Sequence, residues 1–400
     1  MAQFLYLTHE APWPADAGHK LRYTQVIRSL GRLGQVHFAA FTGPDARDPR
    51  TPQEVPGYGT KSHLLVPRPI RIRRRPLTLL RTGILSLITG APYSELKFMD
   101  ARMTQGMKQV LHRVQPTAAL ATLPMLQYLS ALPQGTKRIL DSHNIEHLLW
   151  EQAASLVPGH LKPFVRREAS LLKAREIKAW NEVDCILTIC DEDADTIRSM
   201  TPRPVVTVPP VLDAPEVINI SSSPKYDGAL LGVWTWGPNE IALRDLLNAL
   251  ERRRSKTPLR LAIAGRGIRP ALAQNLQRAG AEVLGHVEDL AGFYRNTRCV
   301  IAPYHLGGGV RLKVLEALTH GVPVLGTPLA LRGIRGDPQM GTLMGGEADD
   351  LLEQAHALRQ DPSSGDALAQ NALLRVAQFH GEHHAHSALA DLLAKAGIPI

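Results

Sequence analysis

The sequence has very few cysteines and no long apolar run. Among its 400 residues only Cys185, Cys190 and Cys299 are cysteines, which excludes a disulfide framework, and no Cys-x-x-Cys pair suggests a metal site. No stretch approaches the about 18 consecutive apolar residues of a membrane-spanning helix. The N-terminus also lacks the basic and apolar segments of a secretory signal. We therefore expect a cytoplasmic protein.

Acidic residues are missing from one long window. Between Glu54 and Glu95 there is no Asp or Glu, although the chain as a whole carries a net charge of +9. The window contains Arg68, Arg71, Arg73, Arg74, Arg75 and Arg81. Such a cluster predicts a phosphate-rich partner. It has no interleaved aromatic residues and belongs to no recognised nucleic-acid module, so we expect no nucleic acid as a partner.

A short apolar helix is predicted directly after these arginines. Following Pro76, the apolar residues are Leu77, Leu79, Leu80, Ile84, Leu85, Leu87 and Ile88. An amphipathic helix on anionic lipid shows this pattern, which would make the region from Arg68 to Arg81 a peripheral contact with the inner face of the cell membrane. An ordinary helix packed on the N-terminal half, with a charged entry loop, shows it equally well.

Short apolar runs alternate with helical patterns along the whole chain, which predicts an α/β protein with parallel sheets. The expected strands are 4–8, 36–41, 118–122, 138–141, 185–189 and 205–208, then 228–233, 259–264, 282–284, 299–302 and 323–326. The length favours two domains. We expect Rossmann-like domains over 1–212 and 225–375, a linker over 213–224, and a last helix in 376–400 that packs back on the first domain.

Three consecutive glycines, Gly307, Gly308 and Gly309, stand between an expected strand and a helical pattern. Glycines let the backbone approach a bound group closely, and the helix N-terminus adds about half a positive charge. This geometry suits a diphosphate. Gly321 is expected to end the helix at the position that follows its C-cap.

Lys313 and Glu316 share one face of this helix, about 60° apart on the helical wheel. The cation could hold a phosphate and the carboxylate a ribose diol, and Arg311 in the first turn could also reach an anion. The alternative is a glycine-rich turn before a helix with a solvated i,i+3 ion pair.

Six short motifs occur in order in this half of the chain. They are Gly232-x3-Trp236-Gly237-Pro238-Asn239, Ala264-Gly265-x-Gly267, Gly285-His286-Val287, Pro303 through Gly309, Arg311-Leu312-Lys313-x2-Glu316-Ala317 and Gly321-x-Pro323-Val324. With them, residues 232–333 resemble the donor domain of family 4 glycosyltransferases (glycosyl transferases group 1). That resemblance implies the GT-B fold, in which two Rossmann-like domains face each other across a cleft.

The resemblance also implies roles for residues. Glu316 would hold the ribose of a nucleotide sugar, the diphosphate would rest on residues 308–313, and Val287 would line the donor site. Gly308 stands where many members carry the first glutamate of a Glu-x7-Glu motif, so the chain resembles the subset with a Gly-Gly-Gly loop. Members also often place an Arg and a Lys where this chain has Trp236-Gly237-Pro238-Asn239. Charge neutralisation would then fall on Arg311 and Lys313, which we assign as catalytic.

The N-terminal opening, Tyr6-Leu7-Thr8-His9-x2-Pro12-x-Pro14-x-Asp16-x-Gly18, resembles the acceptor domain of the same family. There the loop after the first strand faces the donor phosphates and the acceptor. Gly18 is the candidate for close backbone approach to the donor, and Asp16 for the acceptor side. An ordinary strand-to-helix turn is the alternative.

A second candidate group follows the strand expected at 138–141, and reads Asp141-Ser142-His143-Asn144-x-Glu146. Open α/β sheets bind ligands at the carboxyl ends of their strands. We assign His143 as a catalytic group that orients the sugar or handles a proton, with Asn144 and Glu146 in support. A structural, hydrogen-bonded histidine is the alternative.

Two further patterns look like metal sites but are interpreted otherwise. Asp191-Glu192-Asp193 is expected to open a helix, where the dipole favours acidic residues. The tail histidines His380, His383, His384 and His386 lack a completing carboxylate or cysteine set. We expect no metal and no cofactor.

The resemblance implies a retaining, metal-independent glycosyltransferase that moves a sugar from a nucleoside-diphosphate sugar to an acceptor hydroxyl. It would act in glycan, glycolipid or glycosylated-metabolite biosynthesis, on a lipid-linked sugar, a polysaccharide or a small molecule. One alternative is a sugar-nucleotide epimerase of the same fold, which would need no acceptor. Another is a non-catalytic partner subunit, which the glycine at position 308 allows and the intact Glu316 and Lys313 oppose.

Overall fold

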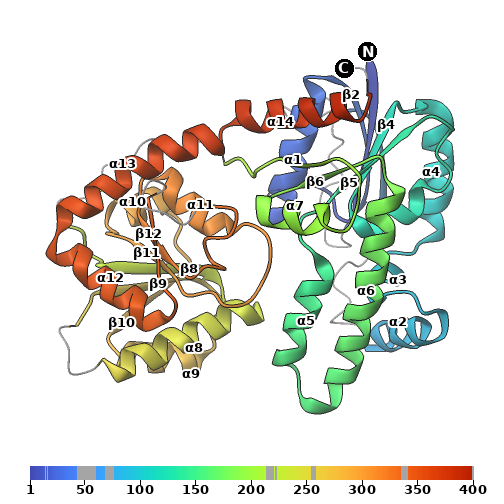
Figure 1. The fold of residues 1–400 in the computed structure, drawn as a ribbon. Helices are drawn as coiled ribbons and strands as arrows, with labels where there is room; N and C mark the ends of the chain where they lie inside the picture. The colour runs from blue at the N-terminus through green and yellow to red at the C-terminus, as the bar shows by residue number, and fades with distance from the viewer. Residues whose placement is uncertain are drawn as a thin grey trace. The chain divides into compact units, whose positions relative to one another are not determined.

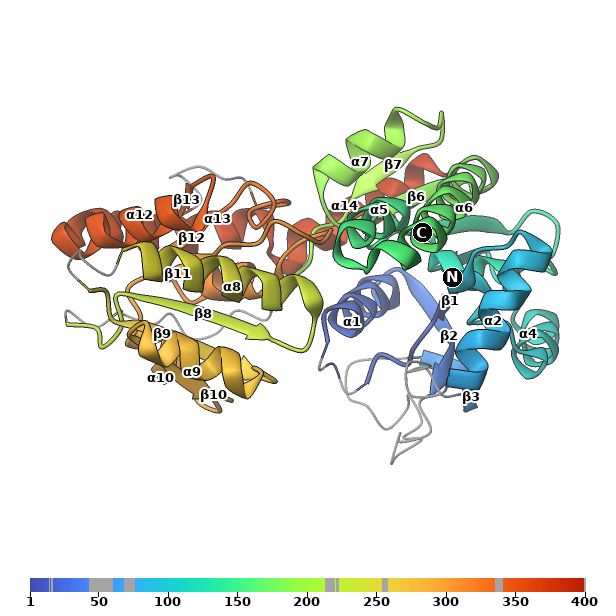
Figure 2. The same cartoon turned by 90° about the horizontal axis from the view of Figure 1, so that it is seen from below.

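The computed structural model describes residues 1–13, 15, 17–42, 60–67, 76–212, 220, 223–253, 258–334 and 341–398, without the side chains of 60–63 and 76–79. The chain forms two compact units, of which the first comprises Met1–Pro210 with Ala385–Ile400 and the second Val211–His384. Figures 1 and 2 show a parallel sheet with flanking helices in each unit.

The first unit is built on a seven-stranded sheet in the order β3-β2-β1-β4-β5-β6-β7, in which all neighbours pair in parallel. Its strands are β1 (Ala2–Thr8), β2 (Gly34–Thr42), β3 (Thr60–Pro67), β4 (Ala118–Ala121), β5 (Lys137–Asp141), β6 (Cys185–Thr188) and β7 (Val205–Thr207). Its helices are α1 (Gly18–Gly31), α2 (Pro76–Thr89), α3 (Tyr93–Leu96), α4 (Ala101–Val114), η3 (Leu123–Leu129), α5 (Glu146–Leu156), η4 (Gly159–Leu161), α6 (Lys162–Glu182) and α7 (Asp191–Arg198).

Apolar side chains on the strands of this sheet hold its helices in place. Leu5 and Leu7 of β1 pack in one cluster with Met103 and Met107 of α4. Parallel strands are covered on both faces, which is why β1 is buried at nearly every position. Helix α7 begins at Asp191 and carries three acidic residues in its first turn, which confirms the interpretation of that tripeptide as a helix start.

Helix α2 buries polar side chains and exposes apolar ones, the reverse of an ordinary surface helix. Its buried side chains include Thr82 and Ser86, and the Ser86 hydroxyl donates a 2.6 Å hydrogen bond to Glu168 of α6. Its apolar residues Leu80, Ile84, Leu85, Leu87 and Ile88 are 38–77% exposed. The apolar face predicted from the sequence therefore points to solvent. Arg81 is exposed beside it, and the other arginines of the cluster lie outside the described residues.

The second unit contains a six-stranded parallel sheet in the order β10-β9-β8-β11-β12-β13. Its strands are β8 (Gly228–Val233), β9 (Leu261–Arg266), β10 (Ala281–Gly285), β11 (Val300–Ala302), β12 (Val324–Gly326) and β13 (Thr342–Met344). Its helices are α8 (Gly237–Arg252), α9 (Pro270–Arg278), α10 (Leu290–Arg295), α11 (Leu312–Thr319), α12 (Ala348–Gln360) and α13 (Pro362–Phe379), and α14 (Glu382–Lys395) follows. From Ala385 onward α14 belongs to the first unit.

Alternate residues of these strands belong to two separate cores. Leu230 and Ile301 pack with α8, α9 and α12, whereas Leu231 and Ala302 pack with α10, α11 and α13. Helices thus cover both faces of the sheet.

Each sheet has one point at which the strand order reverses. It lies between β1 and β4 in the first sheet and between β8 and β11 in the second. In open α/β sheets the crevice outside the carboxyl ends of the strands at such a point binds ligands. The segments that follow β1 and β11 therefore lie where sheets of this kind bind ligands.

All the strands expected from the sequence are present, and β3 and β13 are additional. Residues 213–219 and 221–222 of the expected linker lie outside the described residues. In the described part of the chain, none of the helices is long and apolar enough to span a bilayer.

Candidate functional site

The glycine loop leaves the carboxyl end of β11 and leads into α11. Gly307 has a φ of +123° and Gly309 a φ of +63°, both in the region that favours glycine. A Cβ atom on Gly307 would lie 2.1 Å from Nη2 of Arg311. The absence of a side chain at position 307 therefore makes room for the arginine that follows.

Arg311, the residue before the first turn of α11, folds back across this loop. Its Nη2 donates a 2.6 Å hydrogen bond to the carbonyl of Leu306, and its Nη1 lies 3.5 Å from the carbonyl of Gly308. The guanidinium also lies 5.6 Å from the ring centroid of Trp236 and 5.5 Å from that of Tyr304, within the range of cation–π attraction. Its Nε is buried and has no acceptor among the described residues.

Lys313 and Glu316 face each other on α11. The Lys313 Nζ lies 2.7 Å from Oε2 of Glu316, with the lysine 48% and the glutamate 23% exposed. The buried hydroxyl of Tyr294, from α10, donates to the same Oε2 at 3.2 Å, and burial raises the pKa of Tyr294 well above its usual value. Oε1 of Glu316 receives no hydrogen bond from the described residues, so it remains available to a ligand.

The sequence also predicted positions for Val287, in the donor site, and for Gly321, at the end of the helix. Val287 is partly buried and packs against the core beneath α10 and α11. Gly321 follows the C-cap of α11 with a φ of +72°, which confirms its expected place at the helix end.

The structure thus gathers glycines, cations and a carboxylate at the reversal point of the second sheet. Backbone N–H groups at the start of α11, with Arg311 and Lys313, can neutralise an anion such as a phosphate. The carboxylate of Glu316, held by Tyr294, can accept hydrogen bonds from hydroxyl groups. The group has the donors and acceptors that a phosphorylated sugar or nucleotide requires.

In the first unit one expected site residue, His143, contacts Asp141 at the end of β5. Its buried carboxylate accepts hydrogen bonds from Tyr6 at 2.5 Å and from Arg22 at 3.1 Å, and it lies 3.0 Å from Nε2 of His143. Burial opposes ionisation, but the charge of Arg22 and the contact with His143 hold the pKa of Asp141 well below its usual range. His143 is therefore oriented by an ionised carboxylate.

The residues that follow His143 start α5. Asn144 is hydrogen-bonded to the carboxyl group of Glu146, and burial together with the charge of Glu176 raises the pKa of Glu146 to about 7. Gly18 is the first residue of α1 and is exposed. Asp16 lies outside the described residues.

Sequence reasoning did not find the partners that orient these groups. Tyr294 stands 22 residues before Glu316, and Arg22 stands 119 residues before Asp141. Only the fold brings such pairs together, because neither spacing corresponds to one helix face or one strand.

Residues 230–361 match the model of the family described as "Glycosyl transferases group 1". This segment is about a third of the chain and contains the glycine loop and α11. Curated proteins give no match to the chain.

Solved structures resemble the whole chain in fold. Sucrose-phosphate synthase from Thermosynechococcus elongatus superposes with a TM-score of 0.69 at 14% identity, over 98% of both chains. Anabaena Alr3699/HepE in complex with UDP and glucose gives a TM-score of 0.65 at 11% identity, over 99% of this chain and 100% of that one. The lipopolysaccharide outer core galactosyltransferase WaaB gives 0.64 at 12%, over 98% and 99%. The two parallel-sheet units therefore form the GT-B fold, as expected from the sequence.

Proposed function

We propose that this protein is a glycosyltransferase that moves a sugar from a nucleoside-diphosphate sugar to an acceptor hydroxyl. The observation that carries the proposal is the family match over residues 230–361, because it includes the loop and helix in which Glu316 and Lys313 meet. The Anabaena structure with UDP and glucose supports a uridine nucleotide as the first donor to test.

Donor binding divides among three groups of the second unit. The ribose hydroxyls donate to Glu316, whose Oε2 is already held by Tyr294 and Lys313. The diphosphate lies against the backbone N–H groups of the glycine loop and the start of α11. The Nε of Arg311 is a buried donor without an acceptor among the described residues, and a phosphate oxygen is an acceptor that would satisfy it.

The chemistry requires stabilisation of the charge that develops on the leaving diphosphate. Lys313 and Arg311 supply it, and fixed charges of this kind are effective because they need no reorganisation during the reaction. We propose transfer with retention and without a metal, as the sequence resemblance implies. His143, fixed by Asp141, orients the sugar or handles a proton, and Asn144 and Glu146 support it.

The test compares nucleotide binding by calorimetry in the wild type, Glu316→Gln and Glu282→Gln. Glu282 is a matched control, since it forms an ion pair with Lys225 at 3.0 Å on the same unit. We expect Glu316→Gln to lower the affinity for UDP or UDP-sugar by about 10-fold or more, the equivalent of about 1.4 kcal/mol. Glu282→Gln should bind as the wild type does. Equal affinities in all three proteins would overturn the assignment of Glu316.

Incubation with a panel of nucleotide sugars separates the rival activities. A glycosyltransferase requires an acceptor for stoichiometric release of the nucleoside diphosphate. An epimerase would convert the sugar nucleotide or release free nucleotide with no acceptor present, and such a product would exclude transfer as the main activity.

We also propose that the protein docks peripherally on an anionic membrane surface through α2. Its polar residues Thr82 and Ser86 are buried while Ile84 and Ile88 are 47% and 77% exposed. An apolar face turned outward beside exposed Arg81 is typical of a helix that inserts at the headgroup level of anionic lipid. The acceptor would then be a lipid-linked sugar.

A further inference from the structure

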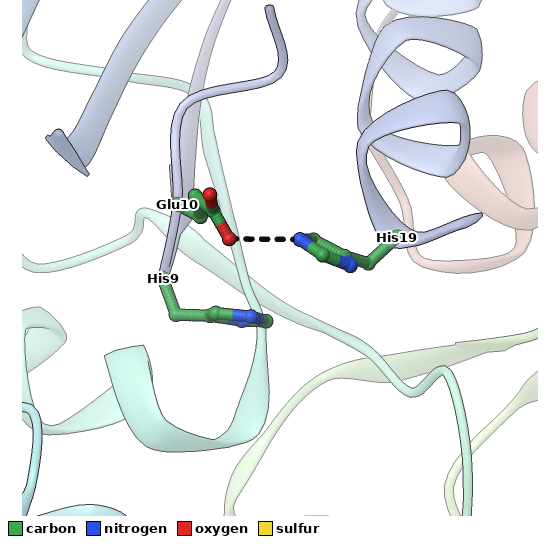
Figure 3. Close-up of side chains that lie close together, drawn as sticks. All are labelled: His9, Glu10 and His19. Carbon is green, nitrogen blue, oxygen red and sulfur yellow. Dashed lines mark hydrogen bonds and ion pairs between the residues drawn. The ribbon is translucent and has the colours of Figure 1, made fainter. Parts of the chain in front are cut away.

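Three potential metal ligands lie together at the reversal point of the first sheet. His9 and Glu10 follow β1, and His19 belongs to the first turn of α1. One ligand atom from each lies within 4.8 Å of the other two. In the described ranges of the chain this is the single group of three such residues (Figure 3).

Neighbouring contacts fix the orientation of each ligand. Oε2 of Glu10 lies 3.0 Å from Nε2 of His19, as the dashed line in Figure 3 marks, and its Oε1 lies 3.4 Å from the amino group of Lys20. The hydroxyl of Tyr23 lies 2.8 Å from Nδ1 of His9 and so fixes the orientation of that ring. Lys20 thus pairs with Oε1 of Glu10, and Oε2 of the same carboxylate faces His19.

We propose that His9, Glu10 and His19 bind one divalent transition-metal ion of the zinc class. Two imidazoles and one carboxylate form a set that zinc and its neighbours in the first transition row accept, whereas magnesium and calcium prefer oxygen ligands alone. The ion takes the place between Nε2 of His19 and Oε2 of Glu10 that a proton holds in the metal-free protein.

The distances are compatible with that exchange. Ligands about 2.0–2.2 Å from one ion stand roughly 3–4 Å apart. The present spread of up to 4.8 Å closes to this range with movements of about 1 Å, which rotation of the partly exposed Glu10 and His19 side chains provides.

The ion would join the segment that directly follows β1 to the first turn of α1. Three protein ligands leave one tetrahedral position for water or for an oxygen atom of a bound molecule. A metal at this position departs from the sequence-based expectation of no metal, and metal binding can be measured independently of sugar transfer.

The test is zinc titration of chelator-treated full-length protein by calorimetry, with thermal unfolding measured in parallel. The variants are His19→Ala and Glu10→Gln, and the matched control is His384→Ala, which removes an exposed histidine of the tail. We expect the wild type and the control to bind one equivalent of zinc and to melt at a higher temperature with it. Magnesium should have neither effect.

His19→Ala and Glu10→Gln should each lower the affinity for zinc by about 10-fold or more, because each variant loses one metal ligand. Circular dichroism of the metal-free variants shows whether each of them is folded. One folded variant is enough for the test. Cobalt in place of zinc should give visible absorption from tetrahedral coordination in the wild type and in the His384→Ala control, but not in the two ligand variants. The proposal is overturned if the wild type binds no zinc, or if both variants bind one equivalent of zinc as tightly as the wild type does.

Discussion

The ammonium nitrogen of Lys313 lies 2.7 Å from Oε2 of Glu316, one turn farther along α11. Because the pair is partly exposed, it contributes little to the free energy of unfolding, typically below about 1 kcal/mol. The pair sits beside the glycine loop, where the proposed function assigns its charges to donor binding.

Replacement of Lys313 by Met should therefore affect turnover and leave stability nearly unchanged. We expect kcat to fall by about 100-fold, the usual cost of removing one group that stabilises developing negative charge. Lys225→Met, in the exposed pair with Glu282, is the matched control and should retain full activity. Steady-state kinetics and thermal unfolding check both variants, and a Lys313→Met enzyme with unaltered kcat would contradict the role.

Gly307 should tolerate no side chain. Gly307→Ala places a Cβ atom 2.1 Å from Nη2 of Arg311 at a φ of +123°, so the arginine must leave the loop. We expect a loss of about 1–3 kcal/mol in stability, the range for such strained backbone positions, together with weaker nucleotide binding. Gly365→Ala in α13, where a Cβ would meet nothing within 4 Å, should be neutral. Urea unfolding and calorimetry measure the two effects.

Stability should depend on the ionisation of Glu146. Its folded pKa of about 7 exceeds the value of about 4.3 expected in the unfolded chain, so at intermediate pH the folded state binds the extra proton. The contribution of Glu146 is neutral at low pH, turns destabilising as pH rises from about 4 to about 7, and is constant above that range.

Glu146→Gln removes this dependence. The variant should match the wild type near pH 4 and exceed it by up to about 3 kcal/mol near pH 8. Glu151→Gln, at an exposed position on the same helix, should follow the wild-type curve throughout. Urea titrations across the range provide the comparison, and parallel curves for Glu146→Gln and the wild type would refute the raised pKa.

The exposed face of α2 should control attachment to vesicles. Ile84→Ser with Ile88→Ser removes two apolar side chains that insertion would bury, each contributing about 1.5–3 kcal/mol when fully buried. Co-sedimentation with phosphatidylglycerol vesicles should fall by about 10-fold or more. Leu374→Ser, which alters a leucine 71% exposed on α13, is the control and should sediment as the wild type does. Equal sedimentation of all three proteins would exclude α2 as the contact.

Most of the fold could be predicted from the sequence because parallel strands are buried on both faces and appear as short apolar runs. β3 was not predicted, since its segment Thr60–Pro67 begins with polar residues and adjoins the arginine cluster. β13 was not predicted either, since its residues Thr342–Met344 include only two apolar side chains and are flanked by Gly341, Gly345 and Gly346.

The orientation of α2 could not be predicted. Whether its apolar face points inward depends on Glu168, which stands 82 residues after Ser86 and accepts a hydrogen bond from the Ser86 hydroxyl. Periodicity identifies the two faces of a helix, but the partner that buries one of them belongs to another part of the chain.

The candidate site likewise has features that could be predicted from the local sequence and contacts that could not. Gly321 was predicted correctly at the end of α11, because positive φ is a property that glycine supplies locally. The roles of Glu316 and His143 remain predictions. Asp141 belongs to the same sequence motif as His143, but its contact with His143, like that of Tyr294 with Glu316, could be identified only from the three-dimensional arrangement.

The return of residues 385–400 to the first unit has a consequence for protein engineering. Both ends of the chain belong to one unit, so the second unit is an insertion within the first and two crossings connect them. A single protease cut between residues 213 and 224 would not separate the units, since the tail would still tie them covalently. Isolation of the second unit requires two cuts, and the first unit is complete only when its two segments are rejoined or expressed together.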